Sequence, residues 1–427
     1  MKSISDPKDI LGLLSLASLG AAIFLPDTYH QLDRRDGQAW PYGVVGDSWG
    51  SGVAYNNDTL YDNNKDSCLR TKESHGPQME ADTTWIGHDP SGLRDAACSG
   101  SNLVDIVQGQ NQIGKVGNPD VIIMTSGGNK AGFGNIVDVC IYHSKPLHDY
   151  GNAYANDPDR SGDCAKALDD ASETITNPDK LAHALTETID DIFKDPAVSG
   201  NSDFLLYLTG YAQFFGTDYD EWCNKEYWSI PNLKSPRPYL SVNLRQAFND
   251  HVSKVNDLYK TTAESDEYKA KVRYIDLDSG FAGHRFCEPG ANHNDQVNTD
   301  TNFDKVYFWN LNFYGVAAQG NVTTQEAQDA LDGQLVTAWN QPSGGGGGNK
   351  PENGWKLRPF HPRYTGYTAI KNAIFAQLKI DGRPNQNPSS SAISSTPTGT
   401  ITSSSPPPAS SVTSFTPTGT IGSISTL

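Results

Sequence analysis

The chain has 427 residues, with 33 Lys and Arg against 50 Asp and Glu, so its formal net charge is −17 at pH 7. This acidic balance argues against nucleic-acid binding, because such proteins neutralise phosphates with clustered Lys and Arg, and it disfavours electrostatic attachment to anionic lipid. Without a Gly-x-y period, a long heptad run or repeated spanning apolar stretches, the sequence also excludes collagen, coiled-coil and polytopic membrane proteins. We therefore expect a soluble globular protein with a sizeable core.

The amino-terminal segment is predicted to direct export rather than to join the core. Two lysines precede Ile10–Leu25, an apolar stretch that is short for a membrane span and typical of a signal peptide. Two aspartates weaken the positive flank, so an uncleaved anchor stays open as an alternative. We assign residues 1–37 to a signal peptide and a possible pro-segment, and we expect no stable membrane insertion after the signal is removed.

The carboxyl-terminal segment, residues 384–427, is predicted to be a disordered, O-glycosylated tail. It contains no charged residue and is dominated by Ser, Thr and Pro. Such a composition offers too little apolar area to offset the entropy of ordering. A single domain over residues 38–383 is the economical interpretation of the remaining chain.

Four short apolar runs have the composition of strands that are buried on both faces of a sheet. Helical spacing of apolar residues appears between and after them. This alternation implies right-handed crossovers and a parallel sheet with helices on both faces, so the predicted fold class is α/β. The strands are expected, in chain order, at residues 42–45, 120–125, 204–209 and 272–275.

Three helices are predicted from apolar residues that recur every three or four positions. The first follows Asn177-Pro178, a suitable pair for a helix cap and a first helical residue. Two polar stretches, residues 144–178 and 339–357, are interpreted as insertions. The helices are expected at residues 181–192, 244–259 and 367–378.

Six cysteines without a Cys-x-x-C pair favour disulfides in an exported protein over a redox motif or a zinc ribbon. Among the fifteen connectivities that six cysteines allow, we choose sequential pairing because it closes the shortest loops. Asn57 and Asn321 lie in glycosylation acceptor sequences, which fits a secreted, extracellular or cell-wall-associated protein. The predicted disulfides are Cys68–Cys98, Cys140–Cys164 and Cys223–Cys287.

The end of the first predicted strand carries the most informative motif, Gly46-Asp47-Ser48-Trp49-Gly50. A serine between glycines at the carboxyl end of a strand can lie on a tight turn with its N–H aimed at a developing oxyanion. The α/β-hydrolase elbow has the same G-x-S-x-G form, but its serine follows several strands, whereas Ser48 follows the first. This segment alone leaves open an ordinary strand-to-helix turn with Ser48 as N-cap. Asp47 is expected to accept hydrogen bonds of the turn rather than to transfer protons.

Four segments, in the correct order, resemble the sequence blocks of the SGNH (GDSL) hydrolase family, and in particular its secreted fungal-type esterases and lipases. The resemblance covers most of residues 41–378. It implies a flavodoxin-like three-layer α/β/α sandwich and assigns the nucleophile, the base and three oxyanion donors. The segments are Gly46-Asp47-Ser48 with the nucleophile Ser48, Ala97–Ser101 with Gly100, Ser126–Phe133 with Asn129, and Pro359–Pro362 with the base His361. The implied donors are the N–H groups of Ser48 and Gly100 and the side-chain amide of Asn129.

One position departs from the family pattern. The family usually has an aspartate three residues before its catalytic histidine, where this chain has Arg358. A guanidinium cannot accept a hydrogen bond from imidazole, so we expect a Ser48–His361 dyad in which the backbone carbonyl of Arg358 orients the histidine.

The resemblance implies a secreted carboxylic-ester hydrolase that works through an acyl-enzyme on Ser48, and we expect a monomer. Its expected partners are small-molecule, lipid or polysaccharide esters, and it needs no metal or organic cofactor. The alternative is a catalytically weak or inactive cell-wall or carbohydrate-binding protein of the same fold. Arg358 and the Ser/Thr-rich tail favour this alternative.

Other residues are weaker candidates. His284, Cys287 and His293 could suggest zinc, but a cysteine in an exported protein is more often in a disulfide. His284 could still line the pocket, and Trp49 and Trp85 could shape an acyl or sugar site. The remaining histidines are expected on surfaces or loops, at His75, His88, His143, His148, His183 and His251.

Overall fold

The computed structural model describes most of the central part of the chain, within one compact unit. The predicted domain boundaries, Asn321, His148 and nearly all of the stretch 339–357 lie outside the described residues, so the statements about them stay predictions. The described residues are 40–85, 88, 92–143, 161–218, 222–228, 239–296, 305–310 and 357–383.

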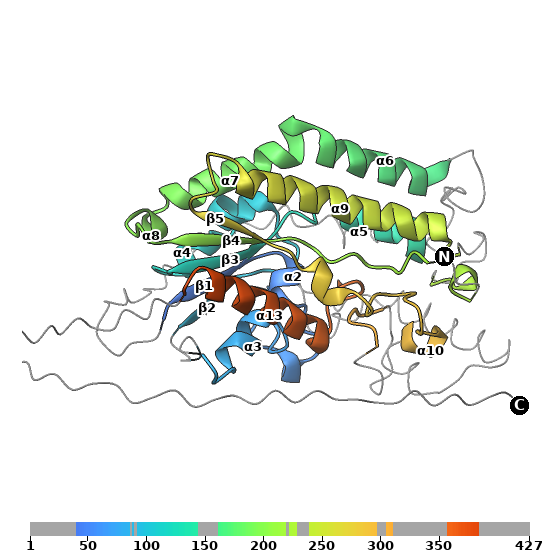
Figure 1. Cartoon of the computed structure of the whole chain (residues 1–427), viewed down its shortest axis with the longest axis horizontal. Coiled ribbons are helices and arrows are strands. Elements are labelled where there is room, and N and C mark those ends of the chain that lie inside the picture. The colour runs from blue at the N-terminus through green and yellow to red at the C-terminus, as the bar shows by residue number, and fades with distance from the viewer. Residues whose placement is uncertain are drawn as a thin grey trace, which may run out of the picture. The chain divides into compact units, whose positions relative to one another are not determined.

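Five parallel strands form a central sheet in the order β2-β1-β3-β4-β5 (Figure 1). This is the strand order of flavodoxin-like proteins, in which the order reverses between β1 and β3 and ligands bind outside the carboxyl ends of the strands. The predicted fold class is confirmed. The strands are β1 (Tyr42–Gly46), β2 (Leu93–Asp95), β3 (Val121–Thr125), β4 (Leu205–Thr209) and β5 (Val272–Ile275).

All four predicted strands are present, with ends that differ by one residue at most. Every residue of β1, β3 and β4 is buried, because helices cover both faces of the sheet. The sequence analysis missed β2. Its three residues, Leu-Arg-Asp, contain no apolar run, and the strand forms by pairing with β1.

The helices form two layers, one on each face of the sheet (Figure 1). One layer contains α5 (Phe133–Val137), α6 (Gly162–Thr176), α7 (His183–Lys194) and α9 (Val242–Glu264), and the other contains α3 (His75–Glu80) and α13 (Tyr364–Ile380). The shorter helices are α2 (Ser48–Ser51), α4 (Gln112–Lys115), α8 (Pro196–Ser199) and α10 (His293–Gln296). Single 3₁₀ or π-type turns occur at Asn57–Thr59, Asp105–Gly109, Asp138–Tyr142, Pro178–Ala182, Cys223–Lys225 and Asp278–Phe281.

The three predicted helices correspond to α7 with the turn before it, to α9 and to α13. As expected, the Asn177 side chain accepts a hydrogen bond from Asp179 N–H, next to Pro178 in the first turn. The interpretation of residues 144–178 as a polar insertion is wrong for its second half, which forms α6. Small residues make up much of the buried stripe of α6, so its apolar signal in the sequence is weak: Cys164, Ala165, Ala167, Leu168, Ala171 and Ile175.

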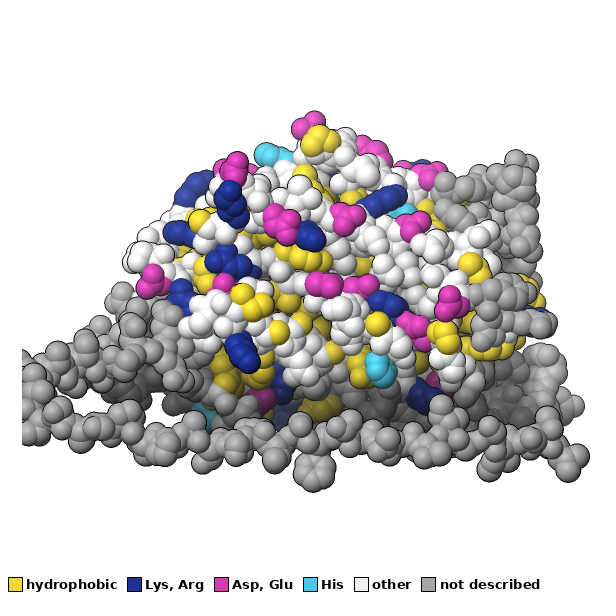
Figure 2. Space-filling view, in the orientation of Figure 1, with side chains coloured by type: hydrophobic (Ala, Val, Ile, Leu, Met, Phe, Trp, Pro, Cys, Tyr) yellow, Lys and Arg dark blue, Asp and Glu magenta, His cyan; other side chains and the backbone are white. Residues whose placement is uncertain are grey.

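The six cysteines form the sequential disulfides Cys68–Cys98, Cys140–Cys164 and Cys223–Cys287. On the face in view in Figure 2, acidic and basic side chains are interspersed rather than gathered into a basic patch. None of the helices within the described ranges has the length and apolar character that crossing a membrane requires.

Candidate active site

Ser48 and His361 are in contact although 313 positions separate them in the chain. The Oγ of Ser48 lies 2.6 Å from Nε2 of His361. Ser48 is the first residue of α2, directly beyond the carboxyl end of β1, and His361 lies in the turn that leads into α13. The pair therefore lies at the edge of the sheet where its strand order reverses, which is the usual ligand site of this architecture.

The surroundings of His361 fix its tautomer. Its Nδ1 lies 3.1 Å from the carbonyl oxygen of Arg358 and 3.0 Å from that of Pro359. Because both oxygens can only accept, Nδ1 carries the hydrogen and Nε2 is left to accept the hydroxyl hydrogen of Ser48. Burial lowers the pKa of His361 to about 4, which keeps the ring neutral at pH 7. The sequence analysis considered the Arg358 carbonyl but not that of Pro359.

The side chain of Arg358 points to aromatic rings. Its guanidinium lies 4.3 Å from the ring centroid of Tyr55 and 3.9 Å from that of Trp309. Such stacking is a favourable setting for a guanidinium that is largely withdrawn from water. The side chain is buried, at 3% exposure, and the contact of this residue with His361 is made by the backbone.

Asp47 is a structural member of the turn. Its Oδ1 accepts the N–H of Trp49 at 2.9 Å, which makes Asp47 the N-cap of α2. The alternative with Ser48 as N-cap is therefore wrong, and the Ser48 hydroxyl faces His361 instead. Oδ2 of Asp47 accepts the hydroxyl of Tyr211 at 2.7 Å, and this hydroxyl accepts the N–H of Gly128 at 2.9 Å. Burial raises the pKa of Asp47 to about 6.

Asn129 lies in the turn after β3 and next to Ser101. One hydrogen of its side-chain amide is donated to the carbonyl of Ser101 at 2.8 Å, which leaves the second for another acceptor. In the described part of the chain no acceptor takes the N–H of Ser48 or that of Gly100.

Gly100 lies in the loop after β2, beside Ser101. Its φ of +88° is in the left-handed region, and a Cβ there would meet no atom within 4 Å, so backbone conformation rather than space favours glycine. Gly100 is exposed and is not one of the residues that line the cavity described below. Of the three predicted oxyanion donors, the structure thus places Ser48 and Asn129 in the cavity wall and Gly100 outside it.

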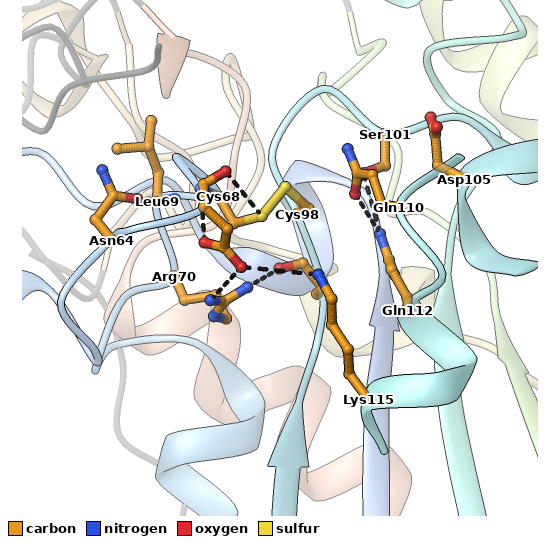
Figure 3. Close-up of a disulfide and its surroundings, with 12 residues drawn as sticks. Asn64, Cys68, Leu69, Arg70, Cys98, Ser101, Asp105, Gln110, Gln112 and Lys115 are labelled. Carbon is orange, nitrogen blue, oxygen red and sulfur yellow. Dashed lines mark hydrogen bonds and ion pairs between the residues drawn. A yellow bond between two sulfur atoms is a disulfide. The ribbon is translucent and has the colours of Figure 1, made fainter. Parts of the chain in front are cut away.

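Gln112, at the start of α4, clamps the residue that ends β1. Its Oε1 accepts the N–H of Gly46 at 2.7 Å, and its Nε2 donates to the Gly46 carbonyl and to Ser101 Oγ, each at 3.0 Å. Figure 3 shows Gln112 beside Ser101 and Gln110. Gly46 itself has no space for a side chain, since a Cβ would lie 1.9 Å from the carbonyl oxygen of Thr125. The sequence analysis missed Gln112, because a lone glutamine carries no motif.

The disulfide Cys68–Cys98 supports the loop that carries Gly100 (Figure 3). The N–H of Ser99 donates to the Cys68 carbonyl at 3.0 Å. Beside it, Arg70 donates to the carbonyl of Ala97 at 3.1 Å and pairs with the carboxylates of Asp62 and Asp66 at 2.6 and 2.8 Å.

A cavity opens next to the Ser48–His361 pair. It has about 640 Å³ of empty space, part of it open to solvent. Most of its wall is apolar and comes from α5, α6, α9 and the segment after β4. The lining residues are Asp47, Ser48, Trp49, Gly128, Asn129, Ala131, Phe133, Ile136, Ile175, Tyr211, Phe214, Phe248, His251, Val252, Val255 and His361.

Among the aromatic and zinc candidates, Trp49 lines the cavity. Trp85 packs instead against Trp40 and Tyr42. His284 stacks on Tyr307 and does not line the cavity. The side chain of His293 lies outside the described residues, and no group of three or more described His, Cys, Asp or Glu side chains could hold a metal ion. Asn57 is exposed, and its glycosylation stays a prediction.

The expectation that the other histidines lie on surfaces or loops is wrong for His75, which is buried on the helix α3. His143 directly follows a π-type turn, outside any helix or strand, and is buried. His251, on α9, lines the cavity, with Nδ1 at 2.7 Å from the Ala247 carbonyl and Nε2 at 2.8 Å from the Leu168 carbonyl. A neutral or hydrogen-bonded imidazole can be buried, and the sequence pattern does not reveal which histidine finds such partners.

Comparisons with known proteins find partial similarity to lipases. No protein-family model matches the chain. Over 137 residues, 32% of the chain, it is 29% identical to Lipase 1 of Streptomyces coelicolor, and over 103 residues, 24% of the chain, it is 33% identical to a lipase of Streptomyces rimosus. These matches span 47% and 35% of the two relatives, so the chain covers less than half of either.

Two solved structures are also similar, at low identity. The extracellular lipase of Streptomyces rimosus has 19% identity and a TM-score of 0.47, and phospholipase A1 of Streptomyces albidoflavus has 17% identity and a TM-score of 0.48. Each comparison covers 79% of this chain and 99% of the other. Because these relatives come from Streptomyces, the fungal-type assignment stays a prediction. The chain is thus similar, over part of its length, to lipases of Streptomyces.

Proposed function

We propose that this protein is a carboxylic-ester hydrolase of the SGNH type, with Ser48 as nucleophile and His361 as general base. The observation that carries the proposal is the 2.6 Å contact between Ser48 Oγ and His361 Nε2 at the wall of a cavity. The carbonyls beside Nδ1 leave Nε2 as the acceptor, which is the tautomer that a general base for serine requires.

The reaction follows from these positions. As Ser48 Oγ forms a bond to the ester carbonyl carbon, its proton passes to His361 Nε2. The tetrahedral intermediate then expels the alcohol, which takes the proton from His361 and leaves an acyl-enzyme on Ser48. Water gives a proton to the same nitrogen and attacks the acyl-enzyme. The carboxylic acid leaves and Ser48 regains its proton.

The negative charge on the intermediate needs donors at its oxygen. We assign this role to the N–H of Ser48, the second amide hydrogen of Asn129 and the N–H of Gly100. The described residues do not engage either backbone N–H, and Asn129 is held by Ser101, which supports the assignment. Removing one such donor typically costs about 2.7–4 kcal/mol of transition-state stabilisation.

The imidazolium that forms during the reaction has no aspartate in the position usual for the family. The carbonyl oxygens of Arg358 and Pro359 would take that role, since each lies within hydrogen-bonding distance of Nδ1. Neutral carbonyls stabilise a cation less than a carboxylate does, so we expect a working enzyme of reduced rate.

The remaining parts of the proposal concern location and assembly. Three disulfides fit an oxidising compartment, and we propose a secreted, extracellular or wall-associated monomer. The names of the relatives support an ester substrate, and the reaction as written needs no metal or organic cofactor.

The test compares the wild-type chain with Ser48→Ala and His361→Ala on p-nitrophenyl acetate and p-nitrophenyl octanoate. We expect both variants to lose at least about 10⁴-fold in kcat, by analogy with other serine–histidine enzymes. A fluorophosphonate probe should label the wild-type protein at Ser48 and should not label the Ser48→Ala variant. Equal hydrolysis by all three proteins, with no labelling of the folded wild type, would favour a binding protein without catalysis.

A further inference from the structure

We propose that Tyr211 is a positioning residue, whose hydroxyl holds the oxyanion donor Asn129 in place relative to the nucleophile Ser48. The inference rests on the proposed function and deepens it, by adding a residue that acts through others rather than on the substrate. The hydroxyl forms two hydrogen bonds, one with the residue directly before Ser48 and one with the residue directly before Asn129.

The two bonds make the Tyr211 hydroxyl a bridge between two turns. It donates its one hydrogen to Oδ2 of Asp47 at 2.7 Å and accepts the N–H of Gly128 at 2.9 Å. Asp47 is 2% exposed, so water does not compete for its carboxylate. A hydrogen bond to a carboxylate is stronger than one between neutral groups, and a buried site strengthens it further. The bridge therefore ties the turn that carries Ser48 to the turn that carries Asn129.

This bridge crosses three neighbouring strands at one edge of the sheet. The strands β1, β3 and β4 are adjacent, and Asp47, Gly128 and Tyr211 each follow the carboxyl end of one of them. Pairing between β1 and β3 ends at the bond from the N–H of Asp47 to the carbonyl of Thr125. Beyond that bond, no backbone–backbone hydrogen bond joins the two described turns. The Tyr211 hydroxyl supplies a link that strand pairing does not.

Tyr211 is itself held firmly enough to position other groups. Its N–H donates to Oδ1 of Asn256 on α9, and its carbonyl accepts from Nδ2 of the same amide, each at 2.8 Å. The residue is 6% exposed, and its ring meets the Trp49 ring edge-on at a centroid distance of 5.2 Å. Because packing and hydrogen bonds lock this side chain, it can fix the groups that it contacts.

The first measurement is steady-state hydrolysis of p-nitrophenyl octanoate by Tyr211→Phe, a variant that keeps the ring and loses only the hydroxyl. We expect kcat to fall about 10-fold to 100-fold, because a small displacement of an oxyanion donor weakens its bond to the transition state. KM should change less than about twofold, since the ring stays in the cavity wall. A wild-type kcat in the folded variant would overturn the inference.

The matched control is Tyr207→Phe. Tyr207 lies on β4, is buried, and donates its hydroxyl to Oδ2 of Asp381 at 2.7 Å, so the control loses a hydrogen bond of the same kind. It does not line the cavity. We expect both variants to melt at a lower temperature than the wild type, and only Tyr211→Phe to lose kcat. Equal losses of kcat would mean that kcat follows stability alone, against the inference.

A double-mutant cycle tests whether Tyr211 acts through Asn129. In the Asn129→Ala background the positioned donor is absent, so Tyr211→Phe should lower kcat by less than about threefold. The same effect of Tyr211→Phe in both backgrounds would overturn the inference.

Asp47→Asn tests the bridge from its other end, and it decides if Tyr211→Phe does not fold. Asparagine has one carbonyl oxygen where Asp47 uses two, so it can cap α2 only by giving up the bond from Tyr211. We expect kcat to fall about as far as in Tyr211→Phe, and again by less than about threefold in the Asn129→Ala background.

The outcomes distinguish the two proposals. If Ser48→Ala hydrolyses the ester as fast as the wild type, the proposed function fails and this inference fails with it. If hydrolysis depends on Ser48 while Tyr211→Phe and Asp47→Asn keep the wild-type kcat, only the inference is overturned.

Discussion

The two faces of the sheet differ in what the described side chains form above them. On the face that carries α3 and α13, Ile370, Ile374 and Leu378 are buried, and the Tyr367 ring packs near His75. On the face that carries α5, α6 and α9, the side chains leave a cavity that reaches Ser48. His361 precedes α13 and is therefore anchored by the face that carries α3 and α13. The comparison indicates that this layer anchors the base, whereas the other layer leaves room for a ligand.

Beyond the substitutions of Ser48 and His361, the largest effect is expected at the sheet edge that both faces share. Asn129→Ala removes a proposed oxyanion donor, so we expect kcat to fall by about 100-fold to 1,000-fold. Asn129 is exposed, and the thermal unfolding midpoint should change little. Steady-state kinetics and a melting curve measure both. An unchanged kcat would show that the cavity wall at Asn129 does not contact the reacting oxygen.

The burial of His361 predicts an unusual dependence of kcat/KM on pH. Because burial lowers the pKa of His361 to about 4, the neutral base persists as the pH falls and is lost only as the pH passes through that value. At pH 5 we therefore expect kcat/KM about thirtyfold higher than for a histidine with a pKa of 6.5. The measurement is kcat/KM from pH 3.5 to 8. An acid limb centred near pH 6.5 would mean that His361 is not desolvated in the free enzyme.

A smaller effect on kcat is expected at Gln112, which hydrogen-bonds the last residue of β1. Gln112→Met would leave the buried N–H of Gly46 without a partner, whereas the Gly46 carbonyl would keep the N–H of Cys98. An unsatisfied buried N–H costs about 1–3 kcal/mol of unfolding free energy, and displacement of the Ser48 turn should lower kcat about tenfold with little change in KM. Gln110→Met is the control, since Gln110 accepts hydrogen bonds from Ser101 and Gln112 but does not contact Gly46. Equal kcat values in the Gln112→Met and Gln110→Met variants would argue that Gln112 does not position the turn of Ser48.

The last prediction concerns stability, not activity, on the face that carries α3 and α13. Both ring nitrogens of His75 lack hydrogen-bond partners among the described residues, and burial lowers its pKa to about 4. The unfolded chain therefore binds more protons below pH 6.5, and the folded protein loses stability as the pH falls from 6.5 toward 4.

The His75→Phe variant has no titrating ring at this position, so it lacks the loss of stability that His75 causes as the pH falls. Between pH 7 and pH 5 the variant should lose about 2 kcal/mol less unfolding free energy than the wild type. Urea unfolding at the two pH values measures the difference. An identical pH dependence in both proteins would indicate that His75 is hydrated in the folded state.

The sequence by itself determined much of the framework. Contiguous apolar runs predict β1, β3 and β4, because a strand buried on both faces has to be apolar at every position. The strand β5 is also predicted, but it lies at an edge of the sheet, and its Arg273 and Tyr274 are only half-buried. Sequential pairing of the cysteines also agrees with the structure. The order of the motifs singled out Ser48 and His361, which the structure brings into contact.

Only the tertiary structure decided the rest, because those features depend on partners that are far apart in the chain. The strand β2 exists through its pairing with β1, and α6 has a stripe of small side chains that becomes apolar surface only against α5 and α9. Gln112 matters because Gly46 lies beside it. The cavity is space that several helices leave unfilled. Periodicity reports the local environment of a segment, whereas contacts, burial of histidines and empty space follow from how the segments pack.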